Sequence, residues 1–128
     1  MLPLAYAPAW IAASVLLVAG VIFGGLMPGP PGPDVGHLDK LEHALAYALL
    51  AVWFTGLAVR ANYWKVALAL AGLGIAIEFL QQAMPYGRVS DPWDLAANVL
   101  GIAAGVAFAT RRSGGWALGA ERWLTRRS

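Results

Sequence analysis

The sequence predicts an all-α integral membrane protein with four transmembrane helices, both termini in the cytoplasm, and a short basic interfacial segment at the C-terminus. The first observation is composition: 59% of the 128 residues are hydrophobic and 12% are charged, whereas an average soluble domain has about 25% charged residues. The second is that four apolar stretches approach the roughly 20 residues that a helix needs to cross a bilayer. The third is the uneven placement of Lys and Arg, which sets topology. A soluble globular domain is not expected.

Polar, proline and glycine residues separate the four apolar stretches. The first stretch ends at PGPPGPDVGH, whose prolines lack N–H donors and restrict the residues before them. A polar turn at 60–65 precedes the third stretch, and a Pro/Gly breaker at 84–87 ends it. Pro92 suits the first turn of the fourth, where its missing N–H is not needed. The predicted spans, within a membrane domain of residues 1–110, are 9–27, 39–59, 66–82 and 92–110.

A signal peptide is the alternative interpretation of the first span. The segment has no basic N-terminal region, its apolar run is long, and no A-x-A cleavage site precedes the proline-rich loop. We therefore expect a helix that is retained.

Small residues spaced by four predict close helix contacts on two of the spans. These residues are Gly20 and Gly24 on the first span and Ala97, Gly101, Gly105 and Ala109 on the fourth. Gly72 and Gly74 on the third span likewise predict a thin helix and not a nucleotide-binding loop, because no strand precedes them.

Residues 111–128 form a basic tail in which arginines alternate with apolar and aromatic side chains. Such a segment directly after a membrane span predicts an interfacial anchor on an anionic membrane face. RNA binding is the alternative, but lipid explains Arg interleaved with Trp more simply, so we expect no nucleic-acid partner. The arginines are Arg111, Arg112, Arg122, Arg126 and Arg127, and the apolar residues are Trp116, Leu118, Trp123 and Leu124.

The distribution of Lys and Arg between the two sides of the membrane predicts the orientation. Arg60 and Lys65 lie on the same side as the five tail arginines, whereas the other side has Lys40 and Arg88. Because cytoplasmic loops carry the excess of Lys and Arg, both termini are predicted to be cytoplasmic. The proline-rich loop and the 84–93 loop then lie on the outer face with six of the seven acidic residues, and any chemistry is expected there.

Polar residues recur in the outer halves of three predicted spans. Asp39, His43 and Tyr47 are four residues apart, which places them on one face of the second span. Glu78 lies one turn before Gln81 in an apolar helix, where an ionised carboxylate needs a partner. We expect these groups to converge on one pocket together with Lys40, Arg88, Asp91, Asp94 and Asn98.

Three motifs built from these residues resemble the VanZ-like family of small bacterial membrane proteins. They are D-K-x-x-H-x-x-x-Y from Asp39, E-x-x-Q from Glu78 and R-x-x-D-x-x-D-x-x-x-N-x-x-G from Arg88, and the resemblance covers about residues 39–105. The resemblance implies a four-helix membrane domain in the bacterial cell (inner) membrane. It also implies an association with resistance to the glycopeptide antibiotic teicoplanin and polar residues that act on lipid or lipid-linked head groups.

His43 is the expected general acid or base, because the Asp39 carboxylate one turn away can fix its tautomer and favour its charged form. Glu78 joins these two as a candidate catalytic group. Arg88 is the expected clamp for a phosphate or carboxylate, since its guanidinium binds oxyanions through two hydrogen bonds. A purely structural hydrogen bond for His43 and a salt bridge for Arg88 are the alternatives. The other expected substrate contacts are Lys40, Tyr47, Gln81 and Asn98.

A divalent cation is a candidate cofactor. Asp91 and Asp94, with Glu78, offer oxygen ligands that would hold a cation beside a pyrophosphate or phosphodiester near His43. The alternative is that Arg88, Lys40 and His43 neutralise these carboxylates in a buried network that ties three helices together.

Three functions are open from the sequence. The first is an enzyme that transfers or hydrolyses a phosphodiester or lipid head group, and the second is a non-catalytic binding module for an envelope glycolipid or antibiotic. The third is a small-solute carrier. The clustering of the polar residues at one rim of the membrane argues against a carrier. The expected partners are membrane lipids or lipid-linked envelope precursors. The chain is also a candidate for a homo-oligomer, above all if it is a carrier.

Overall fold

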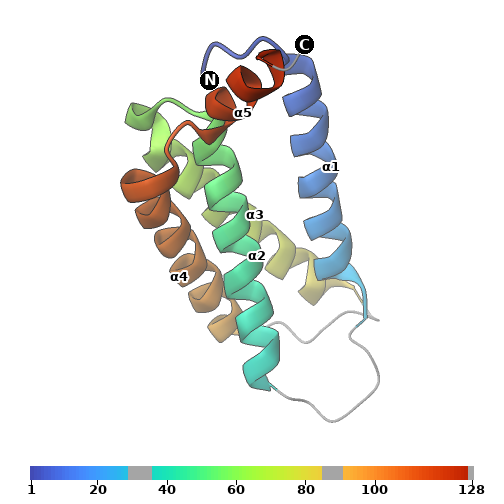
Figure 1. The fold of residues 1–128 in the computed structure, drawn as a ribbon. Coiled ribbons are helices and arrows are strands. Elements are labelled where there is room, and N and C mark those ends of the chain that lie inside the picture. Colours follow the sequence, from blue (N-terminus) through green and yellow to red (C-terminus); the bar gives the residue numbers. More distant parts are fainter. Residues whose placement is uncertain (29–35, 85–90, 127–128) are drawn as a thin grey trace.

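The computed structural model describes residues 1–28, 36–84 and 91–126 of the chain. Within these ranges every regular element is a helix and no strand is present, as predicted (Figure 1). Each long helix begins and ends within one turn of the corresponding predicted span. The long helices are α1 (Ala7–Leu26), α2 (Gly36–Leu57), α3 (Tyr63–Ala83) and α4 (Pro92–Phe108), and the shorter elements are η1 (Arg60–Asn62), η2 (Ala109–Ser113) and α5 (Trp116–Thr125).

Among the described residues, three helical segments are long and apolar enough to cross a membrane: α1, η1 with α3, and α4 with η2. Helix α2 has a similar length of 22 residues, but its first turns carry Asp39, Lys40, Glu42 and His43. Helices α1 to α4 run in alternating directions, and α5 lies at the same end of the bundle as the start of α1 (Figure 1). The opposite end, which we call the polar end, contains the first turns of α2 and α4 and the last turns of α1 and α3.

Helices α2 and α4 make the closest contact in the bundle, because glycine brings their backbones together. A Cβ atom on Gly101 would overlap the backbone carbonyl of Ala44, and one on Gly105 would lie 2.7 Å from the Cβ of Ala51. The predicted row of small residues on the fourth span therefore faces α2. The corresponding prediction for Gly20 and Gly24 on α1 is wrong: nothing described lies within 4 Å of a Cβ built on either.

Helix α1 lies against the rest of the bundle mainly near its two ends, and none of its residues is buried. Near its start, Trp10 packs against Trp53 and Trp116, with ring centroids 5.8 and 5.5 Å apart. Near its end, the Gly25 carbonyl accepts a hydrogen bond of 2.6 Å from the Gln81 side chain. Between these contacts lies an apolar groove of about 670 Å³, whose walls include Val15, Val18 and Ile22 of α1, Phe54 and Leu57 of α2, and Val66 of α3.

Part of the basic tail forms the helix α5, which docks on the bundle. In α5, Ala117 is buried and Trp116 donates a hydrogen bond of 3.0 Å to the Val52 carbonyl. Trp123 and Leu124 are about half exposed, at 53% and 50%. Only part of the apolar surface of the tail is therefore available to a membrane, because the first turn of α5 covers the end of α2.

Candidate functional site

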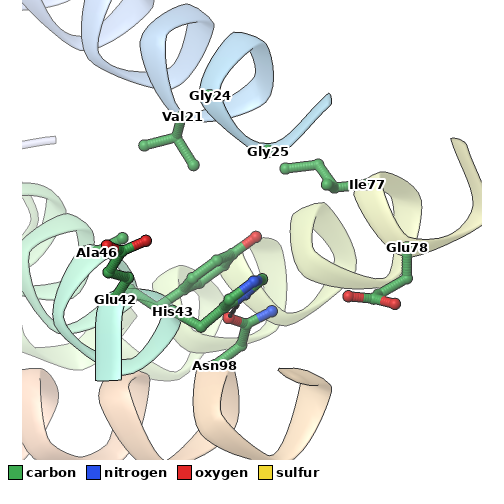
Figure 2. Close-up of a pocket in the computed structure, with 10 residues that line it drawn as sticks. Val21, Gly24, Gly25, Glu42, His43, Ala46, Ile77, Glu78 and Asn98 are labelled. Atoms are coloured by element: carbon green, nitrogen blue, oxygen red, sulfur yellow. Dashed lines mark hydrogen bonds between the residues drawn. The ribbon is translucent and has the colours of Figure 1, made fainter. Parts of the chain in front are cut away.

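The polar end holds a cavity of about 240 Å³ bordered by all four long helices. His43 and Asn98 lie next to each other on one side of it, Glu78 of α3 forms another edge, and Val21 of α1 lies opposite (Figure 2). Because α2 and α4 pack backbone to backbone, their polar side chains at this end project into a shared space. Four of the groups predicted to form one pocket thus line this cavity, namely His43, Tyr47, Glu78 and Asn98.

Lys40 links the first turn of α2 to the start of α4. Its ammonium lies 2.7 Å from Asp91 Oδ2 and 2.9 Å from Asp94 Oδ1. Asp91 is also the N-cap of α4 and accepts a hydrogen bond of 3.0 Å from the Trp93 N–H, as capping aspartates do. The hydrogen bond from Lys40, together with that from Trp93, holds the pKa of the Asp91 carboxyl below its ordinary value. Lys40 and Asp91 therefore form a charged pair that orients Asp94.

The His43 ring is held by its Nδ1 atom, which lies 3.0 Å from Asn98 Oδ1. An amide oxygen only accepts hydrogen bonds, so Nδ1 donates in this orientation of the amide. Nε2 then has a free lone pair in the neutral ring and faces Asp94 Oδ2 at 3.9 Å, which is too long for a hydrogen bond. Asn98 is 2% exposed and Asp94 5% exposed, so two buried side chains of α4 set the tautomer and direction of His43.

Tyr47 lies one turn beyond His43 on α2 and lines the same cavity. Its side chain is buried, and among the described residues no group forms a hydrogen bond with its hydroxyl. Gly74 makes room for it, because a Cβ at that position would lie 3.3 Å from the hydroxyl oxygen and 3.1 Å from the Asn98 amide nitrogen. A buried hydroxyl without a partner is costly, so this hydroxyl is available to a polar group that enters the cavity.

The two candidate residues of α3 have different positions. Glu78 is buried and lines the cavity. Gln81 is also buried, but its amide nitrogen donates to the Gly25 carbonyl and so ties α3 to α1. Gln81, predicted to contact substrate, therefore helps to hold the wall of the cavity.

The carboxylates group differently from the predicted cation ligands. The ligand atoms that lie within 4.8 Å of one another belong to Asp39, His43 and Asp94. Asp91 belongs instead to the ion pair with Lys40, and Glu78 lies on another helix at a separate edge of the cavity. Arg88, the predicted oxyanion clamp, lies outside the described residues.

Two features of the site were missed by sequence reasoning. Val21, Gly24 and Gly25 of α1 form one wall of the cavity, although nothing in the first span distinguishes this part from an ordinary membrane helix. Glu42 also lines the cavity, although its side chain is largely exposed. Its place one residue before His43, among the other charged residues of that turn, was the available signal.

A scan against protein-family models, a search of curated proteins and a search of solved structures each found no match to this chain. The function is therefore argued from the site itself.

Proposed function

We propose that this chain is a VanZ-like membrane protein of the bacterial cell membrane that binds and acts on a lipid or lipid-linked head group in the cavity at its polar end. The motif residues that carry the resemblance support this proposal, because Lys40, His43, Asp94 and Asn98 contact one another although they come from two distant motifs. In this proposal α2 crosses the membrane together with the three candidate spans, both termini are cytoplasmic and the cavity lies at the outer face.

The observation that carries the proposal is the composition of the cavity walls. Three helices contribute polar side chains, including His43, Tyr47 and Glu78, while α1 contributes the apolar side chain of Val21 and two glycines. A site between helices with a few convergent polar groups and an otherwise apolar lining is typical of small-molecule binding. Its position at the end of three helices long enough to cross a membrane favours a ligand from the membrane interface.

The apolar groove beside α1 supports an amphiphilic ligand. Val21 of α1 lines the cavity, whereas Val18 and Ile22 line the groove, so the two spaces border neighbouring positions of the same helix. The groove walls are almost wholly apolar, with Ser14 as an exception. A head group in the cavity would leave an acyl chain free to lie along this groove.

His43 is the proposed proton-transfer group. With Nδ1 fixed by Asn98, Nε2 can take a proton from an attacking hydroxyl or give one to a leaving oxygen, which general acid–base catalysis requires. Asp94, buried beside it, would stabilise the imidazolium that forms. The reaction class that this arrangement suits is phosphodiester or head-group transfer. Arg88 would supply the positive charge for a head-group phosphate.

Native mass spectrometry of gently solubilised protein tests the proposal. We expect the wild-type protein to retain a defined phosphorylated lipid or lipid-linked precursor and Arg88→Ala to lose it. Arg111→Ala is the matched control, because Arg111 is an exposed arginine at the opposite end of the bundle. The same unselective lipids in all three proteins would contradict the proposal.

The orientation has its own test, because the chain contains no cysteine. Ser90→Cys should react with a membrane-impermeant maleimide added to intact cells, whereas Gly119→Cys, an exposed position on α5, should react only after the membrane is opened. The reverse pattern would place the cavity on the cytoplasmic side and contradict the outer-face assignment.

A further inference from the structure

We infer that the end of the bundle opposite the cavity, which we call the α5 end, binds the head groups of anionic phospholipids through one basic surface. The basic surface is made of six exposed side chains from separate segments, namely Arg60, Lys65, Arg111, Arg112, Arg122 and Arg126. It extends beyond the tail anchor that the sequence predicted, because Arg60 and Lys65 belong to η1 and α3. The inference does not rest on the proposed function, since it concerns the other end of the molecule and involves no reaction.

Arg60 joins two connections of the chain at the α5 end. Its guanidinium donates a hydrogen bond of 2.9 Å to the carbonyl of Thr110, the residue directly before Arg111 and Arg112. These two arginines lie in η2, and both are exposed. A guanidinium has five N–H donors and binds a phosphate through two of them, so Arg60 can keep its carbonyl partner and still bind a phosphate. The contact therefore gathers cations from two distant parts of the sequence.

Helix α5 docks through one side and exposes its basic side. Ala117 and Glu121 are 0% and 6% exposed, whereas Arg122 and Arg126 are exposed to solvent. Leu124, between these two arginines in the sequence, is 50% exposed. A helix that shows cations together with apolar side chains is suited to lie in a membrane interface. The docking of α5 thus adds two arginines and an apolar contact to the basic surface.

The positive charge of the basic surface is not balanced by carboxylates of the described chain. The one described carboxylate at the α5 end belongs to Glu121, which is nearly buried and accepts from the backbone N–H groups of Ala5 and Tyr6. The salt bridges found among the described residues all lie at the polar end. A surface with several unbalanced cations has a positive potential that attracts anions.

The position of the basic surface decides which anion it binds. Arg60 begins one candidate membrane span, and Arg111 and Arg112 lie in the last turn of another. Lipid phosphates are therefore the nearest anions. Trp64, next to Arg60 in the chain fold, is 59% exposed, and the Lys65 ammonium lies 5.5 Å from the centre of its ring. Exposed tryptophan is enriched at membrane–water interfaces, and anionic lipids of the cytoplasmic leaflet attract basic segments beside a span. A membrane surface thus fits better than a nucleic acid.

Enrichment of anionic lipid at the α5 end can be measured with one attached dye, because the chain contains no cysteine. The full chain with Leu124→Cys is labelled and placed in phosphatidylcholine nanodiscs that contain a small amount of a spin-labelled, quenching lipid. We expect spin-labelled phosphatidylglycerol to quench at least about twofold more than spin-labelled phosphatidylcholine, since one basic side chain near an anionic surface changes binding about fivefold. Leu38→Cys is the matched control, because Leu38 is 56% exposed at the polar end, and it should show no such preference.

Substitutions identify the residues that create the preference. Arg122→Gln with Arg126→Gln should reduce it, whereas Arg122→Lys with Arg126→Lys should keep it, because the charge remains. Arg60→Gln with Arg111→Gln should also reduce it, which separates the composite surface from the tail alone. A preference that persists in both glutamine variants, or that responds only to the tail variant, would contradict the assignment.

Salt provides a test that needs no substitution beyond the dye site. At about 1 M NaCl, where the Debye length is about 3 Å, the preference for phosphatidylglycerol should largely disappear. Equal quenching by the two lipids at low salt overturns the inference. A dye that responds to an added RNA oligonucleotide, but shows no preference for phosphatidylglycerol, would also overturn it and assign the basic surface to nucleic acid.

Discussion

The two ends of the helix bundle both contain nearly buried carboxylates, but they complete the hydrogen bonding of those groups differently. At the α5 end, Glu121 is 6% exposed and accepts from the backbone N–H of Ala5 at 2.8 Å, from that of Tyr6 at 2.9 Å and from Trp10 Nε1 at 2.8 Å. At the polar end, Asp94 is 5% exposed and one of its oxygens faces His43 across 3.9 Å. The Glu121 carboxylate holds the structure together, whereas the Asp94 oxygen that faces His43 beside the cavity is suited to catalysis or binding.

The α5 end functions as a clasp made from the two terminal segments of the described chain. Glu121 binds the backbone just before α1, and the Leu2 N–H donates to the Leu57 carbonyl at 2.9 Å. Trp10, Trp53 and Trp116 pack together beside it, with centroids 5.4 to 5.8 Å apart. The clasp fixes one end of α1, and Gln81 fixes the other, so that α1 closes the cavity at the far end of the molecule.

The largest effect that we expect is on catalysis at the polar end. His43→Ala should lower turnover of the bound lipid by about 100- to 10,000-fold, which is the usual contribution of a general acid or base, while the lipid still co-purifies. His37→Ala is the control, because His37 is exposed at the start of the same helix. Turnover is measured from lipid products by mass spectrometry. Unchanged turnover in His43→Ala would remove His43 from the mechanism, and a bound lipid without turnover in the wild type would favour a binding module.

The next largest effect is on the stability of the protein and concerns the close contact between α2 and α4. Gly101→Ala should destabilise the protein by about 1–3 kcal/mol, because the added methyl group overlaps the Ala44 carbonyl and overpacks the interface. Unfolding in detergent micelles measures this change. Gly72→Ala on α3, where a Cβ meets nothing within 4 Å, should leave stability close to that of the wild type. Equal stability of the two variants would mean that the close contact does not contribute as argued.

A smaller effect should separate binding from stability at the polar end. Tyr47→Phe removes a hydroxyl without a protein partner among the described residues, so stability should not fall. Affinity for the lipid should decrease by about 2- to 12-fold, the equivalent of one hydrogen bond worth about 0.5–1.5 kcal/mol. Tyr63→Phe is the control, because Tyr63 is buried but lies beside Gly114, away from the cavity. A drop in stability for Tyr47→Phe with unchanged lipid affinity would assign this hydroxyl a structural role.

The smallest effect is a loss of stability at acidic pH, which we expect from protonation of Glu121 in the clasp. Burial raises the pKa of the Glu121 carboxyl, but hydrogen bonds from Tyr6, Ala5 and Trp10 more than reverse this and leave the pKa below its ordinary 4.5. Since the folded-state pKa lies below the unfolded value, this stabilisation is complete above about pH 4.5 and is lost as the pH falls through the folded-state pKa. Melting temperature against pH should show the loss in the wild type and a weaker pH dependence in Glu121→Gln. Identical pH profiles would assign the acid sensitivity to other groups.

Much of the polar end could be anticipated from spacing alone. Residues four apart on a helix share a face, so Asp39, His43 and Tyr47 were expected together, and so were Asp94 and Asn98. Spacing does not say which oxygen of Asp94 faces which neighbour, and for this reason the predicted cation ligands and the observed group differ. The clasp could not be anticipated in the same way, because Glu121 contacts residues more than a hundred positions away.

The sequence by itself determined the helical class, the approximate bounds of the helices and the end of the bundle where polar groups collect. These properties follow from local periodicity and from the cost of placing polar groups in an apolar environment, and both act over a few helical turns. The tertiary structure alone decided that α1 forms a wall of the cavity, that α5 docks on α2, and that Asp94 turns one oxygen to Lys40 and the other to His43. Such choices depend on contacts between residues far apart in the sequence, such as Trp116 with Val52 and Lys40 with Asp94, which no local pattern encodes.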